Sequence, residues 1–166
     1  ALPKTKITRI RIYQPPNLNQ LFNQSNMVVT VETEAGITGI GEGGAKDTLE
    51  QCAGTLIGKN PFRIEAIWQE MWMAWFYPPG REKIHAVGAM DLALWDIKGK
   101  CLGVPVYEML GGKMRDKVRV YPNGWSYRCV KPEDFARESE RVLKDGYTAI
   151  KIYPLAIPEL DPESHL

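Results

Sequence analysis

The sequence has no long apolar run, few cysteines and almost no net charge, and each shortage excludes a class of protein. No stretch approaches the ~18 apolar residues of a membrane-spanning helix, so we expect no membrane partner. The formal net charge is +1, from 21 basic and 20 acidic side chains, which argues against a nucleic-acid partner. Residues 1–10 lack a secretory apolar core. The three cysteines, Cys52, Cys101 and Cys129, show neither disulfide nor metal-ligand spacing, so we expect a cytoplasmic globular protein.

The first part of the chain has the two-residue period of strands. In residues 4–13, apolar side chains alternate with charged ones, though not perfectly, which predicts a strand. Residues 27–34 are a second expected strand, and a glycine turn with a third short strand follows within 35–44. The simplest arrangement of these strands is an antiparallel meander. Residues 14–26 hold two prolines and four asparagines, which indicates a loop. Loops of this length inside compact domains are usually functional or disordered.

The pattern then changes to the period of helices. Asn60 is the expected N-cap of one of them, with Pro61 at its first helical position. Strands followed by helices define an α+β domain, which we assign to residues 1–113. The predicted helices cover residues 46–58, 60–80, 81–103 and 105–112.

A different order of elements follows in residues 114–166. A strand over 116–125, an amphipathic helix over 131–146 and a strand over 147–153 predict a βαβ unit with a parallel strand pair. One βαβ unit cannot bury both faces of its sheet, so it needs further strands and helices. We therefore expect this sequence to be a fragment of a longer protein.

The helix over 81–103 carries small residues and one unusual carboxylate. Gly88 and Ala89 would let another backbone approach this helix closely. Asp91 lies on its apolar side, and we interpret it as a buried carboxylate bonded to a nearby backbone N–H or arginine, with catalysis as the minor alternative.

Residues 86–112, AVGAMDLALWDIKGKCLGVPVYEMLGG, resemble the signature of the mandelate racemase and muconate lactonising enzyme family of the enolase superfamily. Met109 stands where leucine is usual, a volume-conserving exchange. The resemblance extends over residues 4–154. The matching residues are Ala86, Gly88, Ala89, Met90, Asp91, Ala93, Asp96, Gly99, Lys100, Pro105, Leu110 and Gly111.

The resemblance implies an α+β capping domain followed by the start of a modified TIM barrel, with residues 114–166 as the first βαβ portion. It implies a small-molecule carboxylate substrate, abstraction of its α-proton by a base, and Mg²⁺ as the cofactor that stabilises the enediolate. The family's metal ligands stand at the ends of the third to fifth barrel strands, so we expect no metal ligand in this chain. Members commonly associate, and we expect a homo-oligomer.

The resemblance also identifies Lys151 and Tyr153 as catalytic candidates, because the second barrel strand of the family ends in a Lys-x-Lys pair. Two-residue spacing places both side chains on one face of a strand. A phenol with a pKa of about 10 is a poor base unless an ammonium and a metal lower that pKa. Tyr153 could then act as base, or as acid toward a leaving hydroxide.

Tyr153 stands where the family has its second lysine. This departure from the family pattern favours dehydration of a sugar acid, because a departing hydroxide needs a proton that Tyr153 could supply. Two other roles stay open for the pair: Lys151 orients the carboxylate while Tyr153 only donates a hydrogen bond, or Tyr153 only packs in the barrel. A racemase, epimerase or cycloisomerase of the same family is one alternative function. A non-catalytic capping or oligomerisation module is another.

Two loops of the expected capping domain resemble the family's mobile loops that close over the substrate. They are residues 14–26 and residues 43–46. Asn123 lies near the end of the expected first barrel strand, which we expect at the catalytic end of the barrel. The predicted substrate-binding residues are Asn17, Asn19, Phe22, Gly44 and Asn123.

Overall fold

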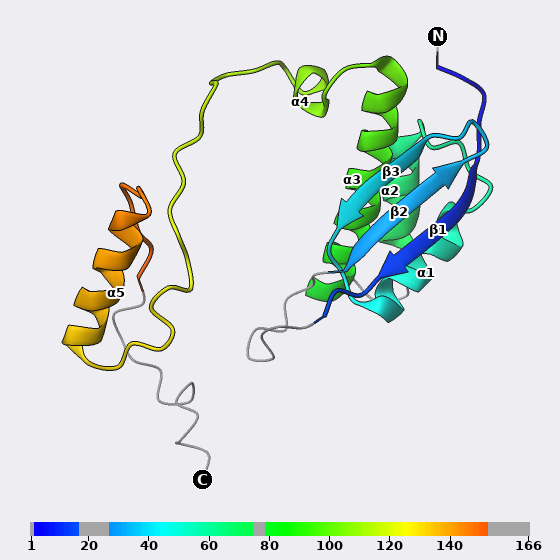
Figure 1. Cartoon of the computed structure of the whole chain (residues 1–166). Coiled ribbons are helices and arrows are strands. Elements are labelled where there is room, and N and C mark those ends of the chain that lie inside the picture. Colours follow the sequence, from blue (N-terminus) through cyan, green and yellow to red (C-terminus); the bar gives the residue numbers. More distant parts are fainter. Residues whose placement is uncertain (1, 17–26, 75–78, 153–166) are drawn as a thin grey trace. The chain divides into compact units, whose positions relative to one another are not determined.

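The computed structural model describes residues 2–16, 27–74 and 79–152 (Figure 1). The chain divides after Lys113 into two compact units, each of which is described by itself. None of the helices in the described ranges combines the length and the apolar character needed to cross a bilayer.

The first unit contains a three-stranded antiparallel sheet in the order β1-β2-β3, as the alternating pattern predicts. The strands are β1 (Ile7–Tyr13), β2 (Val28–Thr33) and β3 (Thr38–Glu42). Val29 and Val31 of β2 are fully buried, and Ile10 and Ile12 of β1 lie opposite them. These side chains point to the same face of the sheet, because successive residues of a strand alternate in direction. That face forms one wall of the core.

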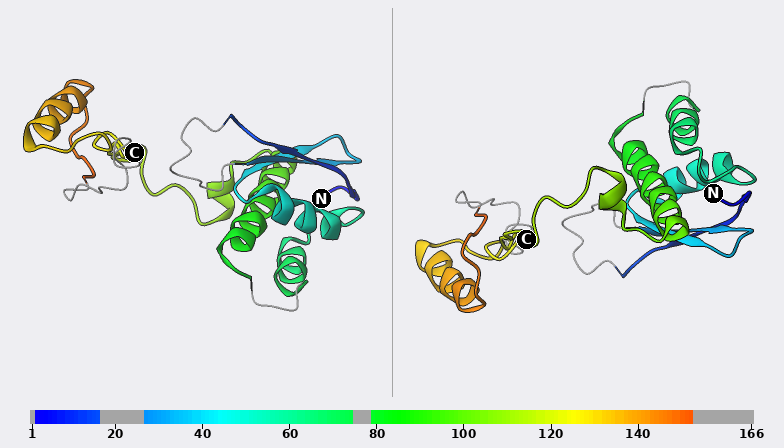
Figure 2. Two further views of the ribbon diagram at one scale, coloured as in Figure 1. Left: turned by 90° about the horizontal axis from the view of Figure 1, so that it is seen from below. Right: turned by 90° about the horizontal axis from the view of Figure 1, so that it is seen from above.

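The helices of this unit lie on one side of the sheet (Figure 2), where α1 (Lys46–Leu56) and α3 (Arg81–Leu102) contact its strands. The longest, α3, lies at the centre of the core and ends at Gly103, whose φ of 69° is the left-handed conformation typical of a helix C-terminus. The helices of this unit are α1 (Lys46–Leu56), α2 (Ile64–Met73), α3 (Arg81–Leu102) and α4 (Val106–Met109).

The predicted start of α2 was wrong. Asn60 does not cap the helix, which begins at Ile64 with Arg63 as its N-cap residue. Instead, the Asn60 side-chain oxygen accepts the N–H of Phe62 at 2.9 Å, and its carbonyl accepts the N–H of Arg63 at 3.2 Å. These bonds close a separate turn before the helix, which is an alternative that asparagine offers with the same chemistry as a cap.

Helix α3 approaches strand β3 so closely that only glycine fits on the facing side of the strand. A Cβ at Gly39 would lie 2.0 Å from the Ala93 carbonyl oxygen, and one at Gly41 would lie 1.9 Å from that of Ala89. Ala89 therefore has the predicted close backbone contact. Gly88 does not, because among the described residues a Cβ there would meet no atom within 4 Å.

Two charged residues of α3 cover the open edge of β3. The Asp96 carboxylate accepts the backbone N–H of Ile40 at 2.9 Å, and the Lys100 ammonium donates to the carbonyl of Thr38 at 2.7 Å. Asp96 and Lys100 also form an ion pair at 2.7 Å. An uncovered edge strand is a template for pairing with another chain, so these signature residues protect the sheet.

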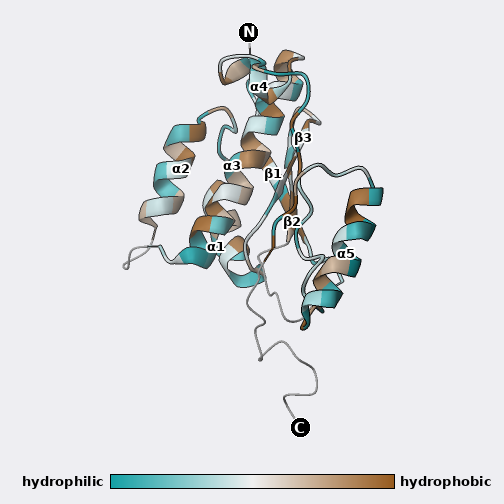
Figure 3. Ribbon diagram, turned by 90° about the vertical axis from the view of Figure 1, so that its left-hand side faces the viewer, coloured by the Kyte–Doolittle hydropathy of each residue, from teal (hydrophilic) through white to brown (hydrophobic). Residues whose placement is uncertain are grey.

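The second unit contains the helix α5 (Pro132–Lys144), which carries hydrophobic and hydrophilic residues in alternating bands (Figure 3). Near its start, the Asp134 carboxylate accepts the N–H of Lys131 at 3.2 Å and pairs with Arg137. The hydrogen bond from Arg137 is the largest cause of the lowered pKa of Asp134, followed by the bond from Lys131.

The two strands predicted on either side of α5 do not form as regular strands in the described residues. Residues 116–123 and 147–152 lie outside any strand, and the side chains of Val118 and Val120 are 70% and 61% exposed. A parallel pair is stable only when both its faces are covered by neighbouring elements. The helix α5 alone cannot supply that cover.

Candidate active site

The candidate site is built on a tight turn in the second unit, just before α5. Gly124 adopts a φ of 81°, and a Cβ there would lie 2.9 Å from the ring of Tyr127, so no other residue fits this position without strain. The N–H of Tyr127 donates to the Gly124 carbonyl at 3.4 Å, and that of Cys129 donates to Ser126 at 3.0 Å. The turn therefore has a defined shape.

The backbone of Lys151 is bound to this turn on both sides of its Cα. Its N–H donates to the carbonyl of Pro122 at 3.2 Å. Its carbonyl oxygen accepts the indole N–H of Trp125 at 2.6 Å. Lys151 is partly buried, and these two bonds fix the direction in which its side chain leaves the backbone.

The segments that carry Pro122 and Lys151 run in the same direction. Arg119 donates hydrogen bonds to the hydroxyl of Thr148, at 3.0 Å, and to its carbonyl. Three residues further along each segment, the Lys151 N–H donates to the carbonyl of Pro122. Both contacts join residues 29 apart in the sequence. A constant offset is the register of a parallel pair, so the neighbours expected of the βαβ unit are present although regular strands are not.

The predicted site residues fall into three groups. Lys151 and the exposed Asn123 belong to the second unit, and the bond from Lys151 to Pro122 places Asn123 next to the backbone of Lys151. Gly44 belongs to the first unit, where it is buried and a Cβ would lie 2.9 Å from the Cα of Ala86. Its role in substrate binding stays a prediction. Asn17, Asn19, Phe22 and Tyr153 lie outside the described residues.

The two predicted capping loops begin or end at one end of the sheet. Tyr13, Val28 and Glu42 pair across the three strands there. A hollow of about 470 Å³ opens beside them and reaches the residues that bound the loops, Gln14 and Lys46. The structure thus brings the bases of both loops together in the first unit. The hollow is lined by Ile10, Ile12, Gln14, Met27, Lys46, Glu50 and Ala53.

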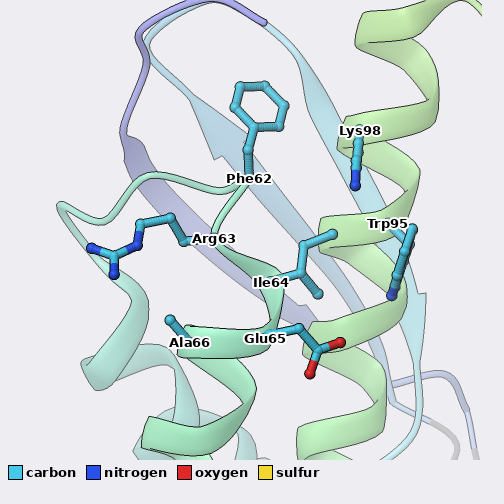
Figure 4. Close-up of a pocket in the computed structure, with 7 residues that line it drawn as sticks. All are labelled: Phe62, Arg63, Ile64, Glu65, Ala66, Trp95 and Lys98. Atoms are coloured by element: carbon cyan, nitrogen blue, oxygen red, sulfur yellow. The ribbon is translucent and has the colours of Figure 1, made fainter.

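A second hollow, of about 320 Å³, lies where the first turn of α2 meets α3 (Figure 4). The Glu65 carboxylate points toward α3, and the ammonium of Lys98 lies 4.8 Å from the ring centre of Trp95. The pKa of the Asp91 carboxyl, also on α3, is raised mainly by burial and further by the negative charge of Glu65. A side-chain hydrogen bond with Trp95 lowers this pKa in part. None of the predicted site residues lines this hollow.

The resemblance implies a magnesium ion in the complete enzyme. Within the described ranges, no group of three or more His, Cys, Asp or Glu side chains is placed to hold a metal ion. Hard divalent cations need several carboxylate or carbonyl oxygens at one point. The described residues therefore do not provide a magnesium site.

Trp125 is a residue of the site whose role the sequence did not reveal. Its bond to Lys151 joins positions 26 residues apart, so no local pattern predicts it. A tryptophan directly after an Asn-Gly turn at the expected catalytic end was the available signal.

These features, an α+β unit with glycines packed under its longest helix and a lysine fixed beside a turn, agree with the sequence signature. Residues 17–111 match the domain described as "Mandelate racemase / muconate lactonizing enzyme, N-terminal domain". That match covers more than half of the sequence, and the chain belongs to the mandelate racemase / muconate lactonizing enzyme family.

Curated relatives carry the names of sugar-acid dehydratases. A D-galactonate dehydratase of Variovorax paradoxus is 40% identical over 154 residues, which cover 89% of this chain and 38% of that protein. A D-gluconate dehydratase of Thermoproteus tenax is 41% identical over 107 residues, 64% of this chain and 22% of that protein. The chain therefore spans about two fifths or less of the length of these relatives.

Solved structures show the same fold over most of the chain. A member of the enolase superfamily from Salmonella Typhimurium matches 89% of this chain and 42% of its own, with a TM-score of 0.78 and 33% identity. The structure of an enolase from Pantoea ananatis with bound D-gluconate and Mg matches 88% and 36%, with a TM-score of 0.69 and 32% identity. The predicted fold class is confirmed.

Proposed function

We propose that, in a protein of the full length of its relatives, this chain supplies the capping domain and the first part of the barrel of a sugar-acid dehydratase. Residues 1–113 are the capping domain and residues 114–166 the start of the barrel. The observation that carries the proposal is the 40% identity, over 89% of the chain, to a protein named D-galactonate dehydratase.

The proposed reaction removes one water from a 2,3-dihydroxy acid. The bond between C2 and its hydrogen breaks, and a base takes the proton. The electron pair forms a double bond between C2 and C3 as the bond from C3 to its hydroxyl breaks, and the hydroxyl leaves with a proton as water. The enol that remains takes a proton at C3 and loses the proton of its C2 hydroxyl, which gives a 2-keto-3-deoxy acid.

Lys151 is the residue of this chain that we propose to act on the substrate. Its ammonium stabilises the negative charge that builds on the substrate carboxylate as the C2 proton leaves. Such a preplaced charge accelerates a reaction because it needs no reorganisation during the step. Tyr153 remains the proposed acid or base, and Asn123 the proposed hydrogen-bond donor to the substrate.

Magnesium is part of the proposal as the cofactor of the complete enzyme. Its support is the neighbour from Pantoea ananatis, whose structure contains Mg together with D-gluconate. In the described ranges, no group of three or more His, Cys, Asp or Glu side chains is placed to hold it.

The test is an assay of the full-length protein with Mg²⁺ on D-galactonate, D-gluconate and other aldonic acids, with the 2-keto-3-deoxy product detected as its semicarbazone. Lys151→Met removes the ammonium, and we expect kcat to fall about 100-fold or more. Lys144→Met removes an exposed lysine from α5 and should leave kcat unchanged. Equal activity of both variants would refute the role of Lys151.

A cytoplasmic location and a homo-oligomeric state also remain proposals. Light scattering on the purified full-length protein measures its oligomeric state directly. A mass equal to one subunit would contradict it.

A further inference from the structure

We propose that Trp125 is a positioning residue, which holds Lys151 in its working place through the hydrogen bond from its indole N–H. This inference rests on the proposed function, because it gives Trp125 a role only through Lys151. It adds a residue whose ring itself need not touch the substrate.

The geometry of the bond supports this role. The distance from Trp125 Nε1 to the Lys151 carbonyl oxygen is 2.6 Å, a short bond for an N–H donor. On the other side of the same Cα, the Lys151 N–H is bound to Pro122. The peptide groups before and after Lys151 are thus both fixed, and together they set the direction of its Cα–Cβ bond.

Trp125 is itself held in place by α5. Its ring lies edge-on to the ring of Phe135, with centres 6.5 Å apart and planes at 89°. Such T-shaped aromatic pairs contribute beyond the area that they bury. The backbone of Trp125 follows Gly124, whose φ of 81° shapes the turn. A rigid chain of contacts therefore runs from α5 through Trp125 to the backbone of Lys151.

A purely structural role makes a different prediction. An indole N–H is only a donor, and a partly buried one usually finds an acceptor, so the bond could serve stability alone. In that case its loss would lower stability without changing turnover by the folded protein. If the bond positions Lys151, its loss lowers kcat, because a small misplacement of a catalytic group reduces rate strongly.

The experiment measures kcat and KM of the full-length enzyme for its best aldonic acid at a temperature where each variant is folded by circular dichroism. Trp125→Phe keeps an aromatic ring beside Phe135 but removes the N–H. We expect kcat to fall about 10- to 100-fold, with a smaller change in KM. Trp68→Phe, in α2 of the first unit, is the matched control and should keep the original kcat.

A double variant separates this inference from the proposed function. If Trp125 acts through Lys151, Trp125→Phe causes little further loss in a Lys151→Met background, because the two effects are not additive. Full activity of Lys151→Met would overturn the proposed role of Lys151 and the inference with it, while the dehydratase function would stand. A large loss in Lys151→Met with an unchanged kcat in Trp125→Phe would overturn the inference alone.

An isostere covers the case in which Trp125→Phe does not fold. Benzothienylalanine, incorporated at position 125, replaces the indole N–H by sulfur and keeps the shape of the ring. The same 10- to 100-fold fall in kcat is expected for this variant. A kcat equal to that of the unmodified enzyme would overturn the positioning role.

Discussion

A methyl group added at Gly41 would lie 1.9 Å from the carbonyl oxygen of Ala89, where the chain has no room for it. Ordinary contacts begin near 3.4 Å, so Gly41→Ala requires α3 and β3 to separate by about 1.5 Å. The obstructing atom belongs to the backbone in the middle of a long helix, so no side-chain rotation relieves the contact. The separation would also loosen Ala93 and Ile97, which are fully buried on the same helix.

The expected destabilisation lies at the upper end of the range for overpacked cores. Such substitutions typically reduce the free energy of unfolding by 1–3 kcal/mol, and we expect about 3 kcal/mol here. For a urea dependence of about 1–3 kcal/mol per molar, the unfolding midpoint should fall by about 1–3 M.

Urea unfolding of the chain, followed by circular dichroism at 222 nm, measures this shift. Gly54→Ala is the control, because Gly54 is exposed inside α1 and its Cβ would meet no atom within 4 Å among the described residues. That variant should gain about 0.5–1 kcal/mol from helix propensity. Equal or greater stability of Gly41→Ala relative to the unmodified chain would refute the close packing of α3 on β3.

Two further predictions concern carboxylates of α3. Asp96→Ala removes the acceptor for the Ile40 N–H and for Lys100, and should reduce the free energy of unfolding by about 1 kcal/mol, because the group is partly exposed. Asp96→Asn should lose less in the same urea experiment. Asp91→Asn should stabilise the chain at pH 7: the raised pKa of Asp91 means that folding disfavours its ionised form. That gain should disappear below pH 3.8, the ordinary pKa, where Asp91 is protonated in both states, and a gain that persists there would contradict the reasoning.

The sequence predicted the first unit well because its signals are local. The alternation around Val29 and Val31 and the change to a helical period identify the meander and α1 to α3. The start of α2 was missed because Asn60 bonds a nearby N–H both in a cap and in a turn. Gly88 was assigned to the contact because adjacent positions in a helix differ by about 100°, and composition alone does not say which one faces the sheet.

The second unit was predicted less completely because strand formation there depends on neighbours. The constant offset between the Arg119–Thr148 and Pro122–Lys151 contacts agrees with the predicted parallel pairing, while regular strands do not form. Lys151 was found through the family pattern rather than through physical spacing. The bond from Trp125 links distant positions, so only the folded chain reveals it.

The central claim is that Lys151 serves the dehydration of a sugar acid. The most direct measurement is the yield of 2-keto-3-deoxy acid from D-galactonate or D-gluconate by the full-length protein with Mg²⁺, compared with its Lys151→Met variant. We expect product from at least one aldonic acid with the unmodified protein and a yield lower by about 100-fold or more with the variant. No product from any aldonic acid with folded, magnesium-supplied protein, or equal yields from both proteins, would contradict it.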